Sequence, residues 1–173
     1  MHNENLYKFV LDNTFGKVKV QKMGSKSLTK PAGRAESSLN IINYNNNPLS
    51  KNPNMEIIVV FGGVNDIKTL NELWIYQSST STWTSIENKP EPLLPRKGHS
   101  AVVFYNYTDG NINQEIMRTY NIIIFGGKND FGYIGDIFII DITYMVLEDK
   151  FFYKFRTIDT SDLDEPEKRE VNY

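Results

Sequence analysis

Cysteine and histidine, two side-chain types that often act as nucleophiles, proton carriers or metal ligands, are scarce in this chain. Cysteine is absent, so the sequence offers no thiolate nucleophile, no thiolate metal ligand and no disulfide, which suits a reducing compartment. The two histidines, His2 and His99, lie far apart along the chain. This small supply of ligands predicts neither a metal site nor another cofactor.

Paired carboxylates could still act as a general acid and a general base. The densest acidic group lies between Asp159 and Glu170, where Lys168 and Arg169 interrupt it. Because charges of both signs alternate in this polar tail, we expect a solvated surface there and no catalytic pair. The chain is therefore predicted not to be an enzyme.

Composition indicates a folded protein whose partners are other proteins. The 173 residues are 40% hydrophobic and 13% aromatic, as in a folded domain. The formal net charge of -2 gives no basic excess for binding nucleic acid or an anionic membrane. The longest apolar runs are too short to span a bilayer, and the amino terminus has no secretory signal pattern. We expect a cytoplasmic protein, with the nucleus as an alternative.

Two short runs of β-branched residues each end in a glycine pair. The first run is 57–61, followed by Gly62-Gly63, and the second is 122–125, followed by Gly126-Gly127. Such runs are typical of buried strands, and paired glycines predict a sharp turn after each strand. Neither pair is followed by Gly-Lys-Thr or by a helix signal, so no phosphate-binding loop is predicted.

The segments after the glycine pairs also repeat. Each pair is followed by an Asn-Asp turn and then by a new apolar strand, at 73–76 in one copy and 137–140 in the other. In the first copy a polar turn leads from Tyr76 to Trp83 in a further strand. The predicted order is strand, strand with Gly-Gly, strand, and strand with an aromatic residue.

These residues resemble the kelch repeat. The pattern of that family includes Arg-x-Gly-His-Ser, which is similar to 96–100 here, and a tryptophan seven residues after a tyrosine, as in Tyr76 and Trp83. The resemblance implies an all-β fold of four-stranded antiparallel blades, as in a β-propeller. It also implies structural roles for the following residues: Arg34, Gly62, Gly63, Tyr76, Trp83, Arg96, His99, Gly126 and Gly127.

The resemblance divides the chain into blades. Residues 1–23 are expected to end a preceding blade, 24–90 to form a complete blade, 91–163 to form a second, almost complete blade, and 164–173 to begin another blade or a disordered tail. The glycine pairs are 64 residues apart (126 − 62), more than the roughly 50 residues of a kelch repeat. Two asparagine-rich insertions, 43–55 and 106–121, explain the excess and are predicted to be mobile loops.

About two to three blades form an incomplete ring, because propellers close with about four to eight. Open ends would leave strand edges and apolar faces uncovered. The chain is therefore expected to be part of a larger propeller, to self-associate, or to persist as a marginal open sheet.

The resemblance also places two sets of loops on one face, where family members commonly bind proteins. The candidate partner-binding residues are Asn65, Asp66, Lys68, Lys128, Asn129, Asp130, Phe131 and Tyr133. Exposed aromatic residues are typical anchors of interfaces. The alternative is that the Asn-Asp pairs only shape turns and that Phe131 packs beneath its own loop.

These features favour a non-catalytic protein-interaction module built from kelch repeats. The alternative is a regulatory kelch region of a multidomain enzyme, such as a phosphatase, a ubiquitin-ligase adaptor or an exchange factor, whose catalytic part is not in this chain.

Overall fold

The computed structural model describes residues 5–12, 17–43, 55–87, 93–105, 117–145 and 150–158, and within these ranges every regular element is a β-strand. The all-β prediction is confirmed. This part of the chain contains no helix with the length and hydropathy needed to cross a membrane. The strands are β1 Tyr7–Asp12, β2 Lys17–Lys22, β3 Ser38–Asn43, β4 Glu56–Phe61, β5 Leu73–Gln77, β6 Thr82–Ile86, β7 Ser100–Tyr105, β8 Met117–Phe125, β9 Lys128–Asn129, β10 Gly132–Tyr133, β11 Ile137–Met145 and β12 Lys150–Ile158.

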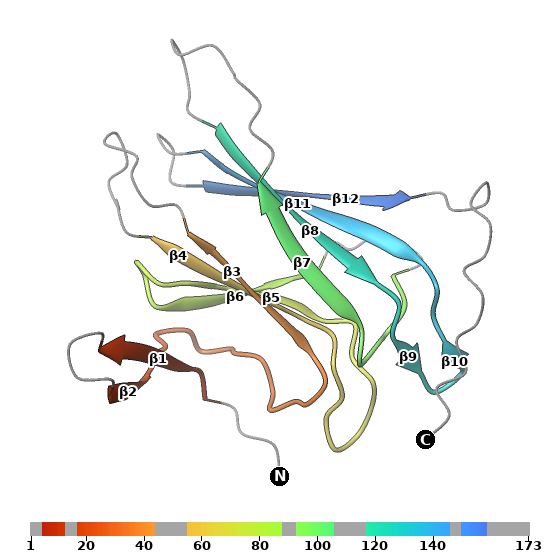
Figure 1. Cartoon of the computed structure of the whole chain (residues 1–173), viewed down its shortest axis with the longest axis horizontal. Coiled ribbons are helices and arrows are strands. Elements are labelled where there is room, and N and C mark those ends of the chain that lie inside the picture. The colour runs from red at the N-terminus through yellow and green to blue at the C-terminus, as the bar shows by residue number, and fades with distance from the viewer. Residues whose placement is uncertain are drawn as a thin grey trace.

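Eight of these strands form two antiparallel four-stranded sheets, which we call blade 1 and blade 2 (Figure 1). Blade 1 has the strand order β3-β4-β5-β6 and blade 2 the order β7-β8-β11-β12. The predicted kelch-type sheets are thus confirmed, and they do not close a ring. Blade 2 is more complete than expected, because β12 pairs with β11 along its whole length.

The main core lies between the two blades. Alternate residues of β4 and β5 face the alternate residues of β8 and β11, and all are almost fully buried. The central side chains of this core are Ile57, Val59, Phe61, Leu73 and Ile75 from blade 1, and Ile122, Ile124, Phe138, Ile140 and Ile142 from blade 2. Burial of two apolar sheet faces against each other holds the blades together.

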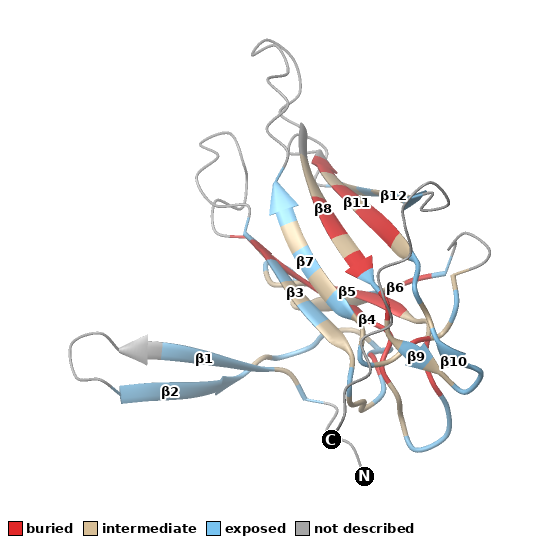
Figure 2. Ribbon diagram, turned by 45° about the vertical axis from the view of Figure 1, so that its right-hand side comes forward, coloured by how far each residue is buried: buried red, intermediate tan, exposed pale blue. Residues whose placement is uncertain are grey.

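A smaller core lies on the opposite face of blade 1. Trp74 and Tyr76 of β5 are buried there. Leu6, directly before β1, and Met23, directly after β2, pack against this core. The hairpin itself projects from the blades (Figure 2), and every described side chain in its two strands is exposed.

The predicted insertion 106–121 is too long. Residues 117–121 belong to β8, because β8 and β11 continue their pairing to Met117 and Met145. Asn43 likewise lies in β3, and Met55, at the end of the other predicted insertion, is 1% exposed. The rest of both insertions, like 159–173, lies outside the described residues.

Candidate functional site

Four of the segments between strands gather along the lower edge of both blades in Figure 1. They are the β4–β5 loop 62–72, the segment 126–136 that contains β9 and β10, and the segments 23–37 and 93–99 that lead into β3 and β7. The candidate partner-binding residues come from the first two of these segments.

Backbone hydrogen bonds join these segments into one platform. Ala35 and Val64 exchange two N–H···O bonds of 2.9 Å, and Lys97 and Lys128 exchange another two of 2.9 Å. Arg96 connects the blades, because its carbonyl accepts from Gly63 N at 2.8 Å and its N–H donates to Leu70 O at 3.0 Å. Loops held in this way present their side chains on a stable scaffold.

An arginine in each blade holds the glycine turn in place. Arg34 donates from Nη1 to Gly62 O at 3.1 Å and from Nη2 to Glu72 Oε2 at 2.6 Å. Arg96 repeats the arrangement in blade 2, with bonds to Gly126 O at 3.1 Å and to Asp136 Oδ2 at 2.8 Å. Both guanidinium groups are thus used within the blades.

The glycine pairs form tight turns beside these arginines. All four glycines have positive φ, from 63° to 97°, a conformation that side chains with a Cβ rarely adopt. A Cβ on Gly63 would lie 2.7 Å from Ala35 O, and one on Gly127 would lie 2.9 Å from Lys97 O. In each blade, the segment that leads into the first strand therefore lies very close to the glycine turn.

Tyr76 and Trp83 are direct cross-strand partners in blade 1. Their ring centroids are 5.1 Å apart, and Tyr76 Oη donates to Gly24 O at 2.7 Å. Ser27 fixes the backbone of Trp83 with bonds of 2.6 Å and 3.0 Å. This cluster attaches the segment 24–27 to the outer half of the blade.

His99 lies at the junction of the two blades. Its Nε2 is 2.8 Å from Ser38 Oγ, and its ring is edge-on to Phe61 at 5.3 Å between centroids. Its Nδ1 is buried without a hydrogen-bond partner among the described residues. Burial, together with the nearby charge of Arg96, lowers the pKa of His99 to about 4.

The depressed pKa of His99 predicts that the protein loses stability in mild acid. In the unfolded chain a histidine protonates near its usual pKa of about 6.5, whereas folded His99 stays neutral down to about 4. Its contribution is therefore complete above pH 6.5 and is lost as the pH falls from there towards 4. Allowing for its partial exposure, we expect the free energy of unfolding to fall by about 1–2 kcal/mol between pH 7 and pH 5.

Urea titrations at several pH values measure this loss, with His99→Phe as the control. The variant lacks the imidazole at the blade junction, so its stability should be nearly flat between pH 7 and pH 5. Carboxylates such as Glu72, whose pKa is lowered from 4.5, lose their contributions only at lower pH. If the free energy of unfolding depended on pH equally in the two proteins, the role given to His99 would be contradicted.

The asparagines of both Asn-Asp pairs shape turns. Asn65 Oδ1 accepts from Ile67 N at 3.0 Å and from Lys68 N at 2.8 Å, and Asn129 Oδ1 accepts from Phe131 N at 2.9 Å. Both asparagines thus act on their own loops, as in Asx turns. The two loops also meet, since Thr69 Oγ1 donates to Asp130 Oδ1 at 3.2 Å.

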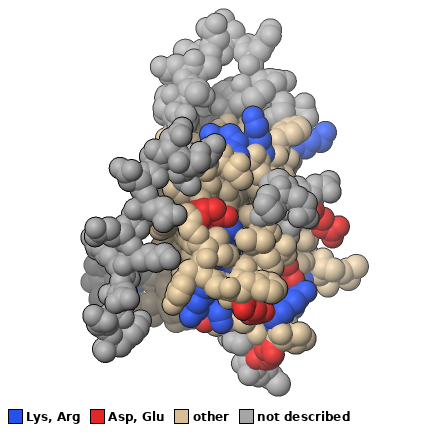
Figure 3. Space-filling view, turned by 90° about the vertical axis from the view of Figure 1, so that its right-hand side faces the viewer, with Lys and Arg blue, Asp and Glu red and all other residues tan. Residues whose placement is uncertain are grey.

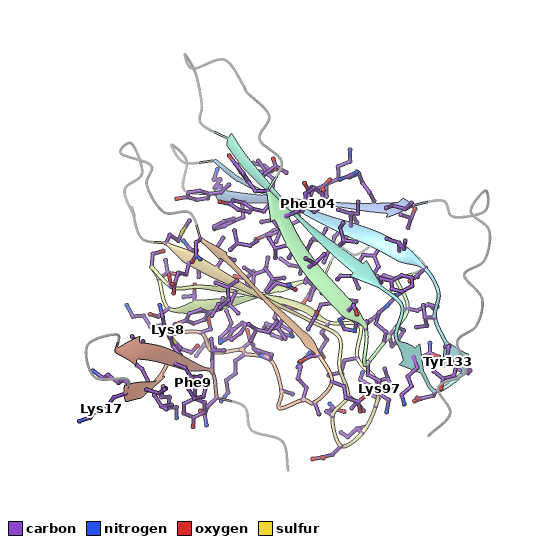
Figure 4. The ribbon with its side chains drawn as sticks, in the orientation of Figure 1. Lys8, Phe9, Lys17, Lys97, Phe104 and Tyr133 are labelled. Carbon is purple, nitrogen blue, oxygen red and sulfur yellow. The ribbon has the colours of Figure 1, made fainter. Side chains whose placement is uncertain are left out.

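The aromatic residues of the β9–β10 hairpin point into solvent. Phe131 is 99% exposed and Tyr133 is 94% exposed, and Figure 4 shows Tyr133 at the same lower edge as Lys97. The alternative in which Phe131 packs beneath its own loop is therefore wrong. Lys68, Asp66 and Lys128 are exposed on the same two loops.

The β4–β5 loop also has an exposed apolar residue that was not among the predicted ones. Ile67 is 88% exposed at the tip of the β4–β5 loop, directly after Asn65-Asp66, just as Phe131 directly follows Asn129-Asp130. The shared position after Asn-Asp is the sequence signal that could have identified it. We call Ile67, Phe131 and Tyr133 the loop triad.

Charges around the blades are mixed in sign. Figure 3 shows Lys and Arg interspersed with Asp and Glu, with no broad field of one sign on the side in view. The described residues contain no group of three or more His, Asp or Glu side chains that could hold a metal ion. The side chains of this edge are thus suited to apolar and hydrogen-bonding contact.

Comparison with known families agrees with this architecture. Residues 56–90 match the Kelch motif, a segment that begins with β4 and includes β5 and β6. No curated protein matches the chain. Together with the two antiparallel four-stranded blades, the match to the Kelch motif shows that the chain contains a kelch repeat.

Proposed function

We propose that this chain is a non-catalytic protein-interaction module and that it binds a partner protein through the loop triad. The observation that carries the proposal is the exposure of Ile67, Phe131 and Tyr133, at 88%, 99% and 94%, on loops joined by hydrogen bonds. Large apolar side chains presented to solvent by hydrogen-bonded loops resemble the anchors that dominate protein interfaces.

The polar residues of the same loops supply the rim of the proposed interface. Asp66, Lys68 and Lys128 are exposed around the loop triad, and charged groups at a rim contribute to partner selection more than to affinity. Asn65, Asn129 and Asp130 act indirectly in this proposal, because their hydrogen bonds hold the loops in shape. The lack of cysteine supports the cytoplasm as the compartment.

Affinity capture from cells, followed by mass spectrometry, tests this function. We expect the chain to retain a defined set of proteins, and a variant with serine at all three positions of the loop triad to lose them. Loss of two or three anchors typically reduces affinity by about a hundredfold or more. Because these side chains are exposed, the variant should keep the circular dichroism spectrum and the unfolding midpoint of the unchanged protein.

A matched control separates the loop triad from exposed apolar residues in general. Leu39 and Ile41 on β3 are 49% and 53% exposed, and serine at both positions should leave capture unchanged. Equal capture by the loop variant and the unchanged protein would overturn the proposed function.

A further inference from the structure

Blade 2 has a face on which no other described sheet packs, and this face carries apolar residues on β7, β8 and β11 and Arg156 on β12. Residues directly opposite each other on paired strands point to the same side of a sheet. Val102, Ile123 and Ile139 form one such row, and Phe125 and Ile137 belong to the next. Val102 is 58% exposed and Phe125 is 48% exposed, whereas Ile139 is 6% exposed. We call these five residues the open face of blade 2.

The same positions are buried in blade 1. Phe61 pairs with Leu73 as Phe125 pairs with Ile137. Each residue of the second pair follows its counterpart in the first pair by 64 positions. Phe61 and Leu73 are 1% and 0% exposed because blade 2 packs on them. On β8 and β11 the open face of blade 2 therefore repeats the positions of β4 and β5 that receive a sheet in blade 1.

The β1–β2 hairpin carries a surface of the opposite kind. Leu6 and Lys8 point towards blade 1, since Leu6 packs on its smaller core and Lys8 Nζ donates to Glu56 Oε2 at 2.8 Å. Tyr7 and Phe9 therefore point away from the blades, and their strand alternation places Val20, opposite Phe9, on the same side. Figure 4 shows Lys8, Phe9 and Lys17 on this projecting hairpin.

This hairpin surface corresponds to the side by which a blade packs on the one before it. The sequence Leu6-Tyr7-Lys8-Phe9 aligns with 73–76, so Tyr7 and Phe9 take the positions of Trp74 and Tyr76. Trp74 and Tyr76 are 9% and 2% exposed, on the side of blade 1 that faces away from blade 2. Tyr7 and Phe9 are 40% and 69% exposed.

We propose that the open face of blade 2 binds the β1–β2 hairpin of a second copy of this chain, head to tail. The open face of blade 2 corresponds to the side of blade 1 that contacts blade 2. The hairpin surface corresponds to the side of blade 2 that contacts blade 1. An isolated two-stranded hairpin is marginally stable, so its exposed apolar side favours association. Two copies bring four complete blades together, a number with which propellers begin to close.

Sedimentation and light scattering of the whole chain over a range of concentrations test this interface. We expect a mass of two copies that dissociates on dilution. Phe125→Glu on the open face and Phe9→Glu on the hairpin should each weaken the association by about tenfold or more, because each places a charge in an apolar contact. Phe131→Glu, an aromatic-to-glutamate change on the loop triad, should leave the mass unchanged.

Mixing the two interface variants distinguishes head-to-tail binding from other arrangements. The Phe9→Glu copy keeps its open face and the Phe125→Glu copy keeps its hairpin, so a mixture should form a heterodimer through one intact contact. A protein that stays monomeric at its highest soluble concentration, or a mixture that forms no heterodimer, overturns the proposal. The far-ultraviolet circular dichroism of each variant shows that its sheets are intact. The capture experiment on the loop triad fails or succeeds independently of these masses.

Discussion

Replacing Arg96 with methionine is expected to lower the free energy of unfolding by about 3 kcal/mol. The Arg96 side chain is completely buried, its guanidinium donates to both carboxylate oxygens of Asp136, and it lies 5.0 Å from the ring centre of Phe138. Methionine fills much of the same volume but leaves Gly126 O without its donor and Asp136 without its partner. The loss should appear as a lower urea midpoint with an unchanged slope.

Arg156→Met is the matched control for this prediction. Arg156 makes a similar two-point contact with Asp141, at 2.6 Å and 2.8 Å, but its side chain is 45% exposed. Water can replace that contact, so the expected loss is below about 1 kcal/mol. If both substitutions had the same effect, burial would not be what makes the Arg96 contact important.

Local patterns predicted the blades because the relevant partners are close in sequence. Tyr76 and Trp83 are seven residues apart, and a short turn places them opposite each other on β5 and β6. The glycine pairs likewise mark the ends of β4 and β8, because the turns after these strands require positive φ. Features of this kind can be read from neighbouring residues.

Features that depend on distant partners could not be predicted in this way. Asn121 resembled the end of an asparagine-rich loop, yet it is buried in β8, where its amide donates to Asp141, 20 residues away. The exposure of Phe131 also depends on distant parts of the chain, since no described element packs over its loop. Sequence reasoning therefore placed the loops of the candidate site but could not decide which of their side chains face solvent.

Gly62→Ala is expected to be among the most damaging single substitutions in the chain. A Cβ at this position would lie 2.6 Å from Arg96 O and 3.0 Å from the ring of His99. The first contact is with backbone, which cannot rotate away, and φ of 63° adds strain for any residue with a Cβ. Relief requires blade 2 to move away from blade 1, and we expect a loss of roughly 3 kcal/mol or more in unfolding free energy.

The equivalent glycine of blade 2 provides the control. Gly126 has nearly the same φ, 67°, but a Cβ there would lie 3.4 Å from Ile134 O, its nearest neighbour. Gly126→Ala should therefore show only the conformational strain, about 1–2 kcal/mol. Chemical denaturation of both variants measures the difference, which isolates the close approach of Arg96 to the turn of blade 1. Equal losses would mean that conformational strain alone accounts for the glycine at both positions and that the blade junction tolerates a methyl group.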